Sequence, residues 1–222
     1  MKSAKQKTSL SIISPEPKDI SLANHTLKVG VLASGFGSNF EALVRSVKSG
    51  MLNAEIPLII VNNANCGAIE KAKQYNIPYK LLDHRRFNSR EELDLSIAKE
   101  FYNYKIEAIV MAGWMRIATP TLIDKYPGRI VNIHPSLLPS FKGKDAIKQA
   151  LEEGVKITGC TVHLVQNDVD SGPILIQAAV IIEENETYNS LKRKIQIKEH
   201  EILPIGLILA ARNWRSQLKD NK

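Results

Sequence analysis

The sequence predicts a single α/β domain with a mostly parallel central sheet, helices on both faces and a mixed C-terminal part. Two observations carry this prediction. From Leu27 to about residue 133, short apolar runs rich in β-branched residues alternate with amphipathic helical patterns, which is typical of a parallel sheet covered on both faces. The chain of 222 residues is 44% hydrophobic and 24% charged, which suits one well-filled core.

The alternating elements occupy the first part of the chain. The apolar run Leu27–Ala33 is the first expected strand, and the helix that follows it has Phe40 and Leu43 on its apolar face. Further strands are expected at residues 56–61, 79–82, 108–112 and 129–133. Further helices are expected at residues 66–75, 90–104 and about 119–126.

The pattern changes in the last third of the chain. A helix near 144–152 leads to two β-rich runs, Ile157–Val165 and Ile174–Ile182, with a polar turn between them. This part of the sheet should therefore be mixed. A long helix from about Tyr188 to Arg212 follows, and Pro204 inside it should kink it.

The two ends of the chain are basic. The net charge is +7, of which residues 1–26 hold +2 and residues 212–222 hold +3. We expect residues 1–26 to be a mobile extension, residues 27–212 to be the domain and residues 213–222 to be a basic tail. The body has only a mild basic excess, which argues against a nucleic-acid partner and suits a small anionic substrate.

Composition argues against several other classes of protein. No apolar run approaches the ~18 residues of a membrane span, and the N-terminus lacks the apolar core of a signal peptide. Cys66 and Cys160 lie far apart and form no C-x-x-C pair. We therefore expect reduced thiols in a cytoplasmic protein, with no metal site.

The loop Ser34–Asn39 joins the first strand to the first helix and contains two glycines. Ser38 and Glu41 have the spacing of a capping box, so the helix should start there and offer free N–H groups to an anion. A tight structural turn is the alternative. A single phosphate fits better than a dinucleotide, because Phe40 replaces the third glycine and the second strand ends in Asn62–Asn63 without an acidic residue.

A polar pair ends the strand expected at 129–133. Asn132 and His134 are two residues apart, so an extended strand points both side chains to one face. An amide and an imidazole together supply a hydrogen-bond donor and a proton-transfer group for a developing oxyanion. Taken alone, such a pair is more often a polar strand end, but Pro135 and Pro139 predict a rigid loop directly after it.

The stretch VNIHPSLLP at residues 131–139 resembles the signature of the folate-dependent formyltransferases. Three further motifs occur in the order expected of the members that act on phosphoribosylglycinamide in purine biosynthesis: SGFGSN at 34–39, AGWMR at 112–116 and DVDSGP at 168–173. The resemblance runs from about Leu27 to Arg212 and implies a single Rossmann-like formyltransferase domain.

The resemblance also implies a reaction and a catalytic trio of Asn132, His134 and Asp170. The formyl group of 10-formyltetrahydrofolate would pass to the amine of phosphoribosylglycinamide, and no metal would be required because the co-substrate is already activated. Asn132 and a protonated His134 would stabilise the oxyanion. Asp170 would raise the pKa of His134 and help to move the proton from the amine toward the folate nitrogen.

The binding residues come from the same resemblance. The expected contacts of the nucleotide are Gly37, Ser38, Asn39, Gln196, Ile197, Lys198 and Glu199. The expected contacts of 10-formyltetrahydrofolate are Arg90, Met115, Arg116, Ile117, Ala118, Asn132, Gln166, Asn167, Asp168, Val169 and Asp170. Lys142–Gly143 stands where many relatives have Pro-Gly.

Several alternatives stay open at this point. Formyltetrahydrofolate hydrolase would use the same trio with water as acceptor, although 26 residues are too few for its N-terminal regulatory domain. A non-catalytic phosphate-binding module is the alternative from another class. His163 either approaches the site or is a satisfied core histidine. We expect small-molecule partners, no nucleic acid or membrane, and a monomer or homodimer.

Overall fold

The computed structural model describes residues 12–16 and 26–220, with side chains as far as Trp214. The strands are β1 (Ile13–Ser14), β2 (Leu27–Ala33), β3 (Ala54–Val61), β4 (Tyr79–Leu81), β5 (Ala108–Met111), β6 (Ile130–His134), β7 (Ile157–Leu164) and β8 (Ile174–Ile181). The α-helices are α1 (Ser38–Lys48), α2 (Gly67–Gln74), α3 (Arg90–Asn103), α4 (Pro120–Ile123), α5 (Ala146–Glu152) and α6 (Tyr188–Asp220), and His84–Arg86 form a short 3₁₀ turn.

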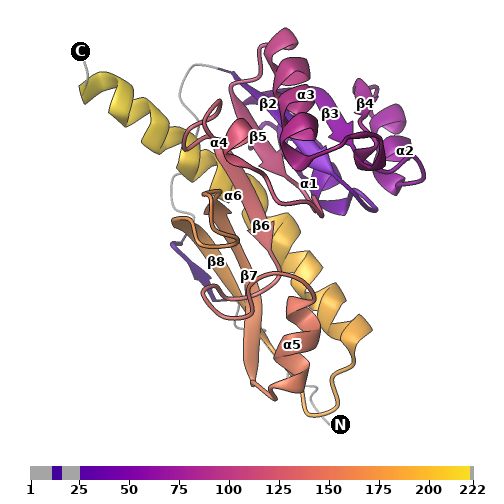
Figure 1. Ribbon diagram of the computed structural model, residues 1–222. Coiled ribbons are helices and arrows are strands. Elements are labelled where there is room, and N and C mark those ends of the chain that lie inside the picture. Colours follow the sequence, from indigo (N-terminus) through magenta and orange to yellow (C-terminus); the bar gives the residue numbers. More distant parts are fainter. Residues whose placement is uncertain (1–11, 17–25, 221–222) are drawn as a thin grey trace.

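All strands belong to one sheet in the order β1-β8-β7-β6-β5-β2-β3-β4 (Figure 1). The neighbours from β6 to β4 are parallel, whereas the pairs β6–β7, β7–β8 and β8–β1 are antiparallel. The predicted α/β class with a mixed second half is therefore confirmed. Strand β2 lies between β3 on one side and β5 on the other, and the chain order reverses at this point of the sheet. A topological switch point therefore lies at the carboxyl ends of β2 and β5.

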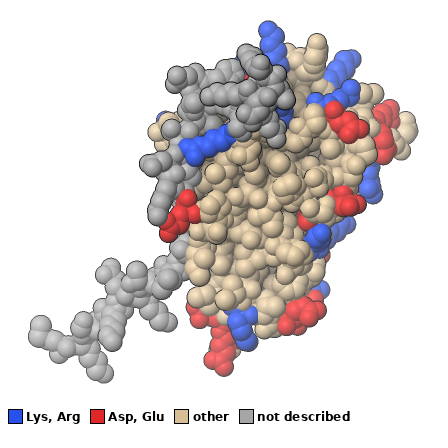
Figure 2. Space-filling model, turned by 90° about the vertical axis from the view of Figure 1, so that its left-hand side faces the viewer, with Lys and Arg blue, Asp and Glu red and all other residues tan. Residues whose placement is uncertain are grey.

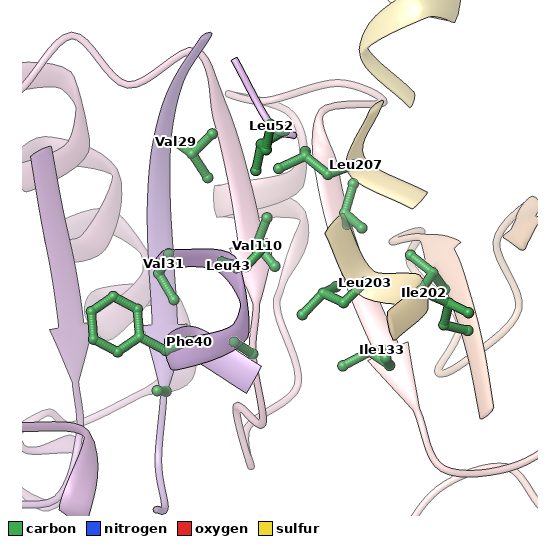
Figure 3. Close-up of a cluster of buried hydrophobic side chains, with 14 of the residues drawn as sticks. Val29, Val31, Phe40, Leu43, Leu52, Val110, Ile133, Ile202, Leu203 and Leu207 are labelled. Atoms are coloured by element: carbon green, nitrogen blue, oxygen red, sulfur yellow. The ribbon is translucent and has the colours of Figure 1, made fainter. Parts of the chain in front are cut away.

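Two hydrophobic cores cover the two faces of the parallel half. On one face, α1, α2 and α6 pack on β2, β5 and β6, with Leu43 of α1 and Leu203 of α6 in the same cluster (Figure 3). On the other face, α3 and α4 pack around Phe101. Val31 belongs to the first core and Leu32 to the second. Both faces of β2 are thus buried, which explains its near-continuous apolar sequence.

Strand β1 corrects one expectation. It lies within residues 1–26, which we expected to be a mobile extension, yet Ile13 and Ser14 pair with Ala178 and Gln177 at the edge of β8. Figure 2 shows this side of the molecule, where charged side chains lie mostly around the rim. The sequence of β8 contains no charged residue. Residues 1–11 and 17–25 of the expected extension lie outside the described residues.

Helix α6 is longer than expected. It continues through Pro204 and past Arg212 to Asp220, so the expected basic tail at 213–222 is helical over its described part. Trp214 is buried, and its indole N–H donates to the Gly128 carbonyl oxygen at 2.6 Å. Gly206 lets the helix approach β7 closely, because a Cβ there would lie 2.4 Å from Cγ1 of Val162. Within the described ranges, no helix has both the length and the apolar character to cross a membrane.

Candidate active site

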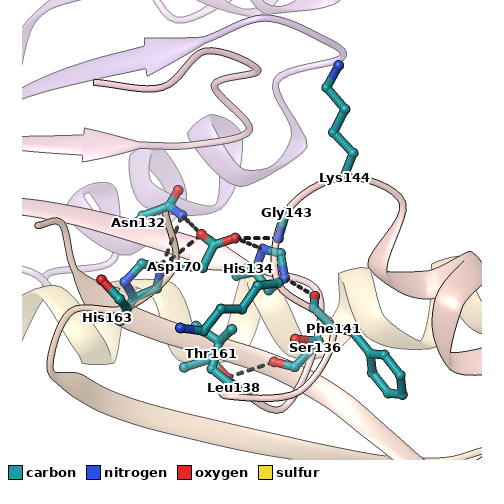
Figure 4. Close-up of polar contacts among 12 residues, drawn as sticks. Asn132, His134, Ser136, Leu138, Phe141, Gly143, Lys144, Thr161, His163 and Asp170 are labelled. Carbon is teal, nitrogen blue, oxygen red and sulfur yellow. Dashed lines mark hydrogen bonds and ion pairs between the residues drawn. The ribbon is translucent and has the colours of Figure 1, made fainter. Parts of the chain in front are cut away.

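The expected catalytic trio meets at the junction of the parallel and antiparallel halves (Figure 4). Asn132 and His134 both lie on β6, and the register with β7 places His163 opposite Asn132. Asp170 comes from the turn between β7 and β8. Strand β6, strand β7 and the turn after β7 therefore contribute to one cluster of Asn132, His134, His163 and Asp170, which we call the catalytic cluster.

Asp170 is the centre of the catalytic cluster. One carboxylate oxygen, Oδ2, lies 3.2 Å from Nδ1 of His134 and accepts the Gly143 N–H at 2.8 Å. The other, Oδ1, lies 3.5 Å from Nδ2 of Asn132 and 3.6 Å from Nε2 of His163. Its backbone has φ 49°, a left-handed conformation that aspartate tolerates better than most residues do.

These contacts keep Asp170 ionised. Burial alone would raise the pKa of its carboxyl group, but His163, the Gly143 N–H and the charge of His134 together hold that pKa below its ordinary value. Gly143 belongs to the Lys142–Gly143 pair noted above, so the contribution of this position is a backbone N–H group. The site therefore contains a fixed negative charge next to two imidazoles.

His134 differs from the expectation of a protonated imidazole. The ring is 5% exposed, and this burial lowers the pKa of His134 even though the Phe141 carbonyl and Asp170 act in the opposite direction. The charge of Asp170 does act to raise the pKa of His134, as expected, but burial outweighs it, so the net shift of this pKa is downward.

The hydrogen bonds of His134 show what a proton would change. Nε2 lies 2.8 Å from the Phe141 carbonyl oxygen, and Nδ1 faces the Asp170 carboxylate. Both neighbours are acceptors, so either neutral tautomer can satisfy only one of them, whereas the imidazolium satisfies both. Burial favours the neutral ring and the contacts favour the charged ring, and a group in such a balance is suited to proton transfer.

His163 is a member of the catalytic cluster, which resolves the open choice between site and core. Its Nδ1 faces the Leu164 carbonyl oxygen at 2.9 Å and so carries a hydrogen, which in the neutral ring leaves Nε2 to accept from Nδ2 of Asn132 at 3.1 Å. This contact orients the Asn132 amide. The sequence pattern around His163 shows that its side chain lies on the opposite face of the strand from Val162 and Leu164. It does not show that Asn132 is the partner, because that contact depends on the pairing of β7 with β6.

The loop Ser34–Asn39 lies at the N-terminus of α1, as expected. Gly37 is the N-cap residue with φ 74°, and a Cβ there would lie 2.7 Å from Cα of Ala68 in α2. The predicted capping box is wrong, because no side chain caps this end and Glu41 instead bonds Lys71, Arg45 and Tyr75. The positive end of the helix is therefore free of a side-chain cap, as an anion site requires.

The second expected nucleotide segment reaches this loop from α6. Nδ2 of Asn39 donates to Oε2 of Glu199 at 3.1 Å, and both side chains are buried. Burial raises the pKa of Glu199 to about 7. Gln196 is half-buried one turn earlier, whereas Ile197 is 57% exposed and Lys198 bonds Glu201. The structure thus brings Glu199 into contact with Asn39, whereas Ile197 points to solvent and Lys198 pairs with Glu201.

The expected folate segment Met115–Ala118 connects β5 to α4, next to the loop Ser34–Asn39. The N–H of Met115 donates to Oγ of Ser34 at 2.9 Å. A cavity of about 390 Å³ opens between these loops and the ends of β3 and β4, and its lining residues are Ser34, Asn62, Asn63, His84, Arg85, Met115 and Arg116. Met115 and Arg116 of the expected folate segment therefore line this cavity, whereas the expected nucleotide contacts Gly37–Asn39 and Gln196–Glu199 are not among its lining residues.

The remaining expected folate contacts lie at the surface. Arg90 is the first residue of α3 and is exposed, and no contact described joins it to the catalytic cluster. Residues 166–169 form the exposed part of the turn that carries Asp170. Across the described residues, no group of three or more His, Cys, Asp or Glu side chains could hold a metal ion.

Comparison with known proteins places this geometry in a family. The family model described as formyl transferase matches residues 27–207. Over 177 residues the chain is 38% identical to phosphoribosylglycinamide formyltransferase of Bacillus subtilis (strain 168), which covers 80% of this chain and 91% of that protein. It is also 42% identical, over 190 residues, to the trifunctional purine biosynthetic protein adenosine-3 of Gallus gallus, which covers 86% of this chain and 19% of that protein.

The structural comparison agrees. The crystal structure of glycinamide ribonucleotide transformylase 1 from Symbiobacterium toebii superposes with a TM-score of 0.84 at 36% identity, over 89% of this chain and 93% of that one. The chain spans about a fifth or less of the length of the trifunctional relatives that it matches. With a family model over most of its length and a bacterial relative covered almost end to end, the chain belongs to the formyl transferase family.

Proposed function

We propose that the protein transfers the formyl group of 10-formyltetrahydrofolate to the amine of phosphoribosylglycinamide, giving formylglycinamide ribonucleotide and tetrahydrofolate. The observation that carries the proposal is the catalytic cluster, in which Asn132, His134 and Asp170 meet; the N-terminus of α1, the proposed phosphate site, has no side-chain cap. The Bacillus subtilis relative bears the name of this enzyme, which supports the assignment.

In the proposed reaction, a bond forms between the amine nitrogen and the formyl carbon, and the bond from that carbon to the folate nitrogen breaks. The Asn132 amide donates one N–H to Nε2 of His163 at 3.1 Å. Its nitrogen has only a long contact of 3.5 Å with Oδ1 of Asp170, so the second N–H is the one assigned to the oxyanion. His134, once protonated, supplies a positive charge near the same oxygen. Asp170 helps to move the proton that the attacking amine loses to the departing folate nitrogen, so the same proton leaves one nitrogen and reaches the other.

The proposed nucleotide site is the N-terminus of α1. Backbone N–H groups of Ser38 and Asn39 would hold the phosphate, and Glu199 would face the glycinamide part. Arg90, residues 115–118 and residues 166–170 would hold the folate, and Met115 and Arg116 of this set line the cavity described above. Both cysteines are free and buried, which supports a reducing, cytoplasmic location. A monomer or homodimer acting on small molecules completes the proposal.

The decisive experiment measures tetrahydrofolate and formylated nucleotide from 10-formyltetrahydrofolate, with and without phosphoribosylglycinamide. We expect both products only when the nucleotide is present. Release of formate and tetrahydrofolate without the nucleotide would replace the proposal by formyltetrahydrofolate hydrolase. Binding of the nucleotide with no turnover of the folate would instead point to a phosphate-binding module.

A further inference from the structure

Ser34 links the two loops that would bind the two substrates. It is the first residue of the loop that ends at Asn39. Its N–H donates to the Gly113 carbonyl oxygen at 3.1 Å, and its Oγ accepts the Met115 N–H at 2.9 Å. One residue of the nucleotide loop therefore fixes the backbone on which the folate segment Met115–Ala118 begins.

Asp94 of α3 fixes the other end of this segment. Its Oδ2 accepts the N–H of Thr119, the residue directly after Ala118, at 2.6 Å. Asp94 is 2% exposed, so this hydrogen bond is shielded from water. The four-residue segment thus has a side-chain acceptor from a different element at each end.

The side chains of the segment contribute little to its placement. Met115 is 76% exposed and Ile117 is 45% exposed, so burial does not fix these two residues. Ala118 is buried but has only a methyl group to pack. The position of the segment therefore depends on hydrogen bonds to its backbone ends, while its larger apolar side chains face outward.

We propose that Ser34 and Asp94 are positioning residues for the folate segment, and that Ser34 couples folate binding to nucleotide binding. This inference rests on the proposed function, because it assigns Met115–Ala118 to the folate. A phosphate at the N-terminus of α1 would order the loop that contains Ser34, and the ordered Ser34 would hold Met115 in place. By linkage, the folate would then improve nucleotide binding by the same factor.

The test is calorimetric titration with 5,8-dideazafolate, a stable folate analogue, in the absence and presence of saturating phosphoribosylglycinamide. Ser34→Ala removes the Oγ acceptor but keeps the Ser34 N–H bond to Gly113. We expect its dissociation constant for the analogue to rise about five- to tenfold, the usual effect of losing one such hydrogen bond. Its Michaelis constant for 10-formyltetrahydrofolate should rise similarly, while kcat changes less than twofold.

Asp94 is tested by a conservative pair. Asp94→Asn keeps an oxygen that can accept the Thr119 N–H, so it should bind the analogue within about twofold of the wild type, whereas Asp94→Ala should not. Ser96→Ala is the matched control, because the Ser96 hydroxyl bonds only Glu92 in its own helix. Melting temperatures of all variants separate a local effect from unfolding.

The outcomes separate the two levels of the proposal. Wild-type affinity for the analogue in folded Ser34→Ala and in folded Asp94→Ala would overturn the positioning role. Equal affinity of the wild type with and without nucleotide would overturn the coupling. A wild-type protein that binds no folate analogue at all would overturn the proposed function and this inference with it.

Discussion

The catalytic cluster and the nucleotide loop at the start of α1 are built in different ways. In the catalytic cluster, side chains hold side chains: Asp170 contacts Asn132, His134 and His163, and each imidazole also bonds a backbone carbonyl. In the proposed nucleotide loop, Ser34–Asn39, the groups assigned to the phosphate are backbone N–H groups at the start of α1, where the N-cap Gly37 is left-handed and no side chain caps the helix. Groups that move protons need fixed orientation and charge, whereas a phosphate site needs only the position of the backbone.

The two regions also respond to protonation in opposite ways. Burial favours the neutral form of both His134 and Glu199, so it lowers the pKa of the imidazole and raises that of the carboxyl. Acidification therefore charges His134 in the catalytic cluster. Rising pH charges Glu199 beside the nucleotide loop. Each of the following predictions tests one side of this comparison.

The largest effect is expected in the catalytic cluster. His134→Ala and Asp170→Asn should each reduce kcat by ~10²–10⁴-fold, because a general acid–base group or its charged partner is lost. Circular dichroism should show a native fold, since asparagine also tolerates the left-handed backbone of residue 170. Asp124→Asn, at the exposed end of α4, is the matched control and should keep full activity. Near-normal turnover of either cluster variant would remove that residue from the mechanism.

The next effect concerns Gly37. Gly37→Val should raise the Michaelis constant for phosphoribosylglycinamide strongly and leave the affinity for a folate analogue within a few-fold. The valine would displace the loop itself rather than collide with the ligand, because a Cβ at this left-handed position would lie 2.7 Å from Cα of Ala68. We expect the free energy of unfolding to fall by about 1–3 kcal/mol as well. Gly50→Val, also left-handed but in open space, is the control for backbone strain alone. Folate affinity lost alone would mean that the loop serves the other substrate.

A smaller effect is expected from the buried carboxyl of Glu199. Its pKa is about 7 in the folded protein and 4.5 ordinarily, so the folded state binds an additional proton between these values. The stability that this proton confers is complete below about pH 4.5 and is lost as pH rises through about 7, by at most about 3 kcal/mol. Glu199→Gln should therefore flatten the fall in melting temperature between pH 5 and pH 8. An unchanged pH profile would show that Glu199 ionises freely.

The smallest effect should follow removal of residues 1–25. Catalysis per molecule should stay within about twofold of the wild type, because β1 lies at the far edge of the sheet from the nucleotide loop. The melting temperature should fall by a few degrees, and self-association at high concentration should increase, because the uncharged edge of β8 loses its partner. Light scattering and thermal melts measure both effects, and identical behaviour of the full and shortened chains would contradict the role given to β1.

Most of the parallel half could be predicted from the sequence, because local periodicity determines its elements. The strand at Leu27–Ala33 agrees at both ends with β2, and the motif spacing placed Asn132 and His134 on one face of β6. Strand β1 could not be predicted, since two residues carry no period and their partner is far away in sequence. The end of α6 was missed for the same reason, because the contact of Trp214 with Gly128 is long-range.

The electrostatics of the site were the least predictable part. The sequence names the charged neighbours of His134, but it does not give their distances or the burial of the ring. The failed capping box makes the same point, since Glu41 has the right spacing and yet bonds Lys71 of α2. Pairs that depend on tertiary packing can override a correct local pattern.

Helix α6 has a consequence for how the molecule comes apart. It packs on α1 in one half of the molecule and on β7 and β8 in the other, and it carries Glu199 between these contacts. Neither half can open while the helix stays in place, so we expect the two halves to unfold as one cooperative unit rather than in steps. Because α6 follows all the described strands along the chain, newly made β6, β7 and β8 would keep one apolar face uncovered until this helix is synthesised.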